Sequence, residues 1–131
     1  MRSNRLIAVV SITALIVSLA PALIAHHSVT AEFDVNKKVT FTGAVKKVDW
    51  MNPHIYVHVE VKETDGKVTV YKVEGSAPNA MYRQGLRPET LPQGTVVTCT
   101  SCSRSKSPTS MNVNGSLRRA DGVALFTSPQ Q

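Results

Sequence analysis

Apolar and polar residues alternate over several short stretches of the chain, which is the pattern of strands with one buried face. Gly43 interrupts the first of these stretches and predicts a bulge or sharp bend there. Asp65-Gly66 follows the second stretch and supplies the positive φ angles that a hairpin turn needs. The alternation predicts strands over residues 39–45, 55–62 and 68–74.

After the third strand the pattern changes to that of one short helix. Ser76 as a cap, Pro78 in the first turn and Gly85 as a stop predict a helix over residues 78–84. A loop over 87–94 with one helical turn follows. Further strands are predicted over 95–100, 111–119 and 123–126, with a Ser-rich loop over 101–110. This order predicts an all-β chain with small α content, folded as an OB-like β-barrel of five to six strands with one short helix after strand three.

The first 25 residues carry the features of a secretory signal peptide. Arg2 and Arg5 precede an almost unbroken apolar run over residues 6–20, which ends in small residues. A retained membrane anchor is the alternative. We expect a periplasmic or secreted protein without stable membrane insertion after cleavage. The predicted organisation is a signal peptide over 1–25, an N-terminal segment of the mature chain over 26–38, the barrel domain over 39–127 and a tail over 128–131.

The cleavage site decides which metal ligands the mature chain has. Cleavage after Ala25 would make His26 the N-terminus, so that an α-amine and an imidazole on one residue form a chelate that suits copper, with His27 next to it. Cleavage after Ala22 would leave an ordinary pair of histidines with weaker imidazole binding. The third alternative is that both histidines are plain polar residues of the N-terminal segment.

The turn before the second strand holds the only Trp and leads to the other two histidines. His54 and His58 are predicted on one strand face about 13 Å apart, so one ion cannot bind both unless the strand bends sharply. We therefore expect either of them to join the N-terminal pair. Met51 and Trp50 add a thioether and an aromatic face that suit Cu(I). Alternatively, Trp50 plugs one end of the barrel and Met51 fills a gap.

Cys99 and Cys102 leave three alternatives open. In an extended strand their Cα atoms would be about 10 Å apart, beyond the roughly 7 Å that a disulfide allows, so a disulfide requires a turn at Thr100-Ser101. Free or metal-binding thiols are the second alternative. A thiol oxidoreductase is the third, with Arg104 as the nearby positive charge that would lower a thiol pKa.

The chain is basic, with a formal net charge of +6 that falls to +4 when Arg2 and Arg5 leave with the signal peptide. The remaining Lys and Arg residues are spread along the sequence. In an exported protein such charge favours an anionic membrane surface or polysaccharide as a partner, and we expect no nucleic acid. A solvated basic surface is the plainer interpretation.

Several short motifs resemble one family of proteins. They are Ala25-His26-His27-Ser28 at the predicted mature start, Trp50 with Asn52-Pro53-His54 in the turn, and Glu74-Gly75 with Pro78-Asn79 after the third strand. These motifs resemble a family of small exported bacterial proteins known only as a domain of unknown function. The resemblance covers nearly all of the mature chain and implies that the double His is habitual at its start. Cys99 and Cys102 depart from the family pattern, which usually has no Cys pair.

The sequence favours a periplasmic, non-enzymatic binding protein for copper or another divalent metal. The candidate ligands are His26, His27, His54, His58 and Met51. No nucleophile elbow, phosphate loop or paired acid is evident, and a copper-dependent oxidase is the enzymatic alternative. The rival hypothesis is a structural or interaction module of the cell envelope that binds a protein or an anionic polymer. Its candidate interaction face carries Trp50, Tyr56 and Tyr71.

Overall fold

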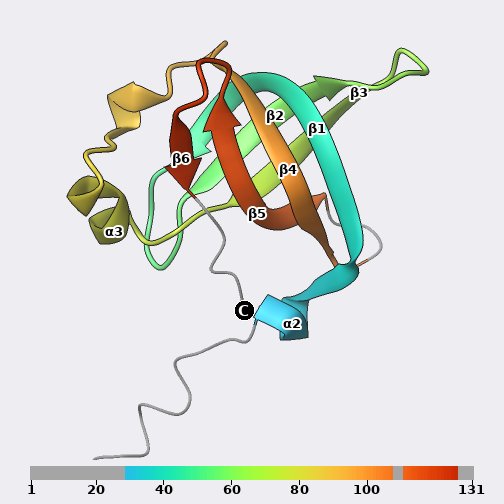
Figure 1. Cartoon of the computed structure of the whole chain (residues 1–131), viewed down its shortest axis with the longest axis horizontal. Coiled ribbons are helices and arrows are strands. Elements are labelled where there is room, and N and C mark those ends of the chain that lie inside the picture. Colours follow the sequence, from blue (N-terminus) through green and yellow to red (C-terminus); the bar gives the residue numbers. More distant parts are fainter. Residues whose placement is uncertain (1–28, 108–110, 127–131) are drawn as a thin grey trace, which may run out of the picture.

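The computed structural model describes residues 29–107 and 111–126, and their six strands form one mostly antiparallel sheet (Figure 1). The helical elements are α2 (Val29–Glu32), α3 (Pro78–Arg83) and the 3-10 turn η1 (Pro88–Thr90). The strands are β1 (Phe33–Asp49), β2 (Tyr56–Lys62), β3 (Val68–Glu74), β4 (Val96–Ser105), β5 (Asn112–Arg119) and β6 (Ala124–Phe126). The prediction of a mostly β chain with little helix is confirmed.

Strand pairing runs in a ring. β1 pairs antiparallel with β2 on one side and with β4 on the other, β2 pairs with β3, and β4 pairs with β5. The ring closes because β3 also pairs in parallel with β5, with Lys72 opposite Asn112 and Glu74 opposite Asn114. β6 pairs with β5 at Leu117 and Arg118, beyond the three residues of β5 that pair with β3. No helix among the described residues is long and apolar enough to cross a membrane.

The core lies inside this ring and follows the period-two pattern of the strands. Val57, Val59 and Val61 of β2 are buried, whereas the residues between them are not. Met81 of α3 is fully buried and covers one end of the same hydrophobic cluster. Burying a side chain of this size stabilises a fold by about 1.5–3 kcal/mol. The apolar residues of the alternating stretches therefore account for most of the core.

β1 is longer than predicted and bulged. It spans 17 residues, and its pairing register shifts between Asp34 and Lys38, between Val39 and Phe41, and between Val45 and Lys47. Each bulge interrupts the alternation of faces, which hides a long strand from a pattern of period two. The bulge expected at Gly43 lies instead at residue 46. Gly43 serves a different purpose, because a Cβ there would overlap the backbone carbonyl of Glu60.

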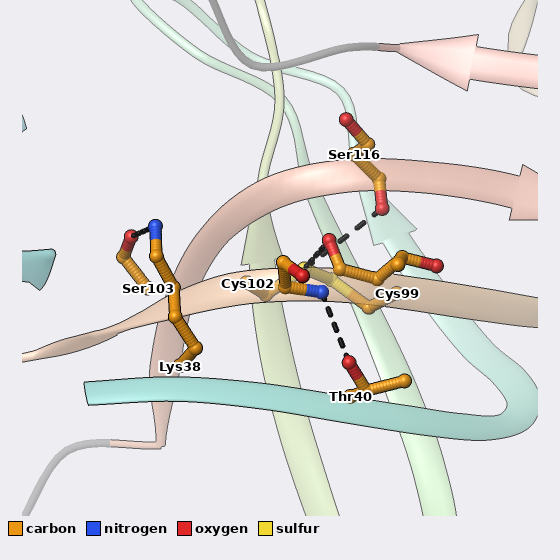
Figure 2. Close-up of a disulfide and its surroundings, with 8 residues drawn as sticks. Lys38, Thr40, Cys99, Cys102, Ser103 and Ser116 are labelled. Atoms are coloured by element: carbon orange, nitrogen blue, oxygen red, sulfur yellow. Dashed lines mark hydrogen bonds between the residues drawn. A yellow bond between two sulfur atoms is a disulfide. The ribbon is translucent and has the colours of Figure 1, made fainter. Parts of the chain in front are cut away.

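β4 continues to Ser105, so the expected loop over residues 101–110 is wrong for its first five positions. Ser101 has a φ of 51°, in the left-handed region, and its N–H donates to the Thr40 hydroxyl at 3.0 Å (Figure 2). Beyond this residue the strand resumes, and Lys38 Nζ donates to Ser103 Oγ at 2.9 Å. A local irregularity therefore looks like a loop in the sequence although the strand continues through it.

The irregularity in β4 brings two cysteines together. Cys99 and Cys102 form a disulfide with their Cα atoms 6.1 Å apart, which an uninterrupted strand would not permit (Figure 2). Both side chains are fully buried. Gly115 of β5 lies directly against Cys102, where a Cβ would overlap both its backbone and its side chain.

Candidate functional site

The turn between β1 and β2 lies beside α3 at one end of the ring (Figure 1). Its last residue, Ile55, is buried and exchanges backbone hydrogen bonds with the segment after β3. The Ile55 N–H donates to the Ser76 carbonyl at 3.1 Å, and the Gly75 N–H donates to the Ile55 carbonyl at 2.9 Å. These bonds fix the position of His54, which comes immediately before Ile55 and follows the cis Asn52–Pro53 peptide bond.

His54 forms a close pair with Glu74. Its Nδ1 lies 2.8 Å from Glu74 Oε1, and the His54 side chain remains 42% exposed. Glu74 is the last residue of β3 and is 9% exposed. Burial raises the pKa of the Glu74 carboxyl, and the positive charge available at His54 acts in the opposite direction. An ionised carboxylate only accepts hydrogen bonds, so in the neutral form of His54 this contact favours the tautomer with the proton on Nδ1 and the lone pair on Nε2.

Glu32 at the end of α2 is electrostatically close to this pair. Its negative charge adds to burial in raising the pKa values of Glu74 and Tyr56. The charge at the end of α2 therefore acts on the same carboxyl that His54 contacts. His26 and His27 lie outside the described residues, and His27 precedes the first of them by two positions.

His58 has a different carboxylate partner. Its Nε2 lies 2.7 Å from Asp49 Oδ2, and Lys47 Nζ lies 2.8 Å from Asp49 Oδ1. The Lys47 and His58 hydrogen bonds hold the pKa of the Asp49 carboxyl below its usual value. The His58 side chain is 17% exposed, so it is less accessible than His54. Within residues 29–107 and 111–126, no three His, Cys, Asp or Glu side chains are placed to hold a metal ion together.

The register of the ring aligns polar residues in two rows on its outer face. One row contains Asp49, Tyr56, Glu74 and Asn114, and the next contains Lys47, His58, Lys72 and Asn112. Contacts run diagonally between the rows, with Lys72 Nζ 3.9 Å from the centre of the Tyr56 ring. The sequence alone did not mark Glu74, Lys72 or Asp49 as site residues. Their period-two positions were visible, but the strand register that aligns them was not.

The predicted interaction face of Trp50, Tyr56 and Tyr71 is wrong for Tyr71. Tyr71 is opposite Val59 in the register, so its side chain points into the core, where it stacks on Phe41 at 4.2 Å between ring centres. Its hydroxyl donates to Glu63 at 3.3 Å. Tyr56 is one residue out of phase with the inward positions and lies on the outer face.

Trp50 and Met51 lie at the α3 end of the ring. The Trp50 ring packs against the core, and its centre lies 5.6 Å from the centre of the Tyr82 ring. The side chain of Met51 is 52% exposed. The Arg87 guanidinium lies over the Tyr82 ring, 4.9 Å from its centre. Tyr82 and Arg87 were not identified from the sequence, because nothing in their spacing indicates that they meet Trp50.

Comparisons with known proteins give one match. A family model described as a family of unknown function, DUF6152, matches residues 13–113 of the chain. No curated protein matches, and no solved structure matches. The match includes both the turn with His54 and the strand that ends in Glu74.

Proposed function

We propose that this chain, which belongs to the DUF6152 family of unknown function, is a non-enzymatic periplasmic protein that binds copper or a similar divalent ion. The proposed ligands are His54 and the N-terminal pair His26 and His27. The proposal rests on the hydrogen bond between His54 and Glu74.

In a metal-binding histidine, the ring nitrogen that does not bind the metal usually donates its N–H to a carboxylate or another acceptor. This hydrogen bond sets the tautomer and orients the ring. The 2.8 Å contact between His54 Nδ1 and the buried Glu74 carboxylate is an arrangement of this kind. It leaves Nε2 as the nitrogen with a free lone pair on a side chain that is still exposed. His58 has a similar contact, with Asp49 2.7 Å from its Nε2, but its side chain is only 17% exposed and therefore less accessible to an ion.

We propose that the remaining ligands are His26 and His27, which lie outside the described residues. His27 is five positions before Glu32, a distance of at most about 17 Å in extended chain. The effect of the Glu32 charge on the pKa of Glu74 supports this assignment. Two or three imidazoles suit copper and zinc, and a free α-amine on His26 would favour copper further.

The fold and location belong to the same proposal. We infer an OB-like β-barrel, supported by the pairing cycle of β1, β2, β3, β5 and β4 and by the helix between β3 and β4. Export is supported by the basic and apolar character of residues 1–25.

Native mass spectrometry of protein exported and processed by its own type of host, titrated with copper and zinc, tests the proposal. We expect one tightly held copper ion per chain. His54→Ala removes a ligand and Glu74→Gln weakens its orientation, so copper affinity should fall about 10–100-fold or more in both variants. His58→Ala is the matched control and should keep the affinity of the unchanged protein.

The same spectra report the mature N-terminus. A mass that begins at His26 would add the α-amine to the ligand set, and a mass that begins at Leu23 would leave the imidazoles alone. Equal copper retention by the His54→Ala and unchanged proteins would refute the site. So would a protein that holds no metal in any form.

A further inference from the structure

A second surface lies at the α3 end of the ring, on the same turn that carries His54. We call it the aromatic patch and define it by Trp50, Met51, Tyr82 and Arg87. Met51 is 52% exposed and Tyr82 is 42% exposed. Isolated apolar side chains at a surface are ordinary, but these two are linked through Trp50, which is next to Met51 in the chain and contacts Tyr82.

The patch is held rigidly by the groups beneath it. Met81 is fully buried, so the adjacent Tyr82 must point away from the core. The Arg87 guanidinium lies 4.9 Å from the centre of the Tyr82 ring, and its Nη1 donates to the carbonyls of Tyr82 and Leu86 at 3.0 and 2.8 Å. Side chains that are already ordered lose little entropy when a partner binds.

The residue types of the patch are those of interface centres. Trp, Tyr and Arg supply most of the residues whose truncation costs the most binding energy, and Met is also enriched at interfaces. Trp50 lies partly within the core, so its ring forms the floor of the patch, while Met51 and Tyr82 provide the exposed apolar area. The arrangement is suited to an apolar side chain of a partner.

The charges beside the patch indicate the character of that partner. Asp49, which precedes Trp50, is paired with Lys47 and His58, and residues 78–95 contain Arg83 and Arg87 against the single Glu89. The patch therefore has a positive surround, within a chain that is basic as a whole. Opposite charge speeds association and selects partners.

We propose that the aromatic patch binds an acidic segment of another protein, with one apolar side chain of that segment placed on Trp50 between Met51 and Tyr82. A membrane surface fits less well. Insertion into a bilayer needs aromatic rings that project from the surface, and the indole Nε1 of Trp50 is buried.

The test selects peptides from a displayed random library on the processed, metal-free protein. We expect enrichment of peptides that combine several Asp or Glu residues with one large apolar residue. A synthetic copy of the most enriched peptide should change the fluorescence of Trp50, the only Trp in the chain. Its affinity should fall about tenfold or more in Met51→Ala, Tyr82→Ala and Arg87→Gln, and should weaken with added salt.

Matched controls lie elsewhere on the molecule. Met111→Ala removes another exposed Met, and Arg118→Gln removes another exposed Arg that donates to a carbonyl, so both should leave the affinity unchanged. Selection of no acidic peptide, or affinity that is the same in the patch and control variants, would overturn the proposal. Binding to vesicles of anionic phospholipid that is lost in the same patch variants would also overturn it, in favour of a membrane surface.

Discussion

Asp49 shows how one side chain joins two elements. Its carboxylate contacts Lys47 of the same strand and His58 of β2, and these contacts lower the pKa of the Asp49 carboxyl. A carboxyl with a lowered pKa in the folded state stabilises the protein above its unfolded pKa of about 3.9, and this stabilisation is lost as the pH falls through the folded-state value.

We therefore predict that Asp49→Asn lowers the free energy of unfolding at pH 7 by about 0.5–1 kcal/mol, as expected for ion pairs near a surface. The difference from the unchanged protein should shrink as the pH falls through the lowered pKa of Asp49, below which both side chains are neutral. Urea unfolding at a series of pH values measures it. Asp121→Asn, which breaks a more exposed pair with Arg119, should have a smaller effect. A difference between the Asp49 variant and the unchanged protein that is constant with pH would contradict the assignment.

At the scale of single residues, the sequence identified types of side chain more reliably than their neighbours. It marked Cys99 and Cys102 as a candidate pair that needs a turn, and the positive φ of Ser101 supplies one. It did not mark Gly115, although a side chain there would collide with Cys102. The need for Gly115 arises from the packing of β5 on β4, and the local sequence carries no trace of that contact.

Among the elements, α3 is the helix that the sequence predicted closely. Pro78 begins it as expected, it ends at Arg83, and Gly85 follows with a φ of +80°. A helix of six residues is not stable by itself, so its position depends on burial of Met81. The aromatic patch depends on the same anchor.

We predict that Met81→Ala lowers the free energy of unfolding by about 2–5 kcal/mol, because it removes a fully buried side chain from the core. Asn79→Ala, at an exposed position of the same helix, should change it by no more than about 0.5 kcal/mol. Chemical denaturation followed by circular dichroism makes the comparison. Similar stability of the two variants would show that α3 does not depend on its contact with the core.

At the scale of the whole molecule, one hydrophobic cluster connects the strands of the ring with α3. The cluster includes Ile55 from the turn, Met81 from the helix and Leu125 from β6. Because the parts share one core, they should unfold together.

We expect the fluorescence of Trp50 and the far-ultraviolet circular dichroism of the sheet to report one transition at the same urea concentration, with the disulfide intact. Trp50 lies at the α3 end, whereas the circular dichroism reports strands throughout the ring. An earlier fluorescence transition would instead mean that the α3 end opens locally before the ring does.

The sequence by itself determined which residues of β2 are buried, where the hairpin turn and α3 lie, and that strand is the dominant element. These properties depend on alternation, on turn residues and on the Pro at the start of α3, all of which act over a few neighbouring positions; the expected Ser76 cap is absent, because Ala77 is the N-cap residue and no side chain caps the helix. Only the tertiary structure decided the length of β1 and β4, since bulges hide the alternation there, and the inward position of Tyr71. It also brought Glu74 to His54 and Tyr82 to Trp50. Those contacts join positions 20 or more residues apart, and they depend on strand register and ring closure, which no local pattern encodes.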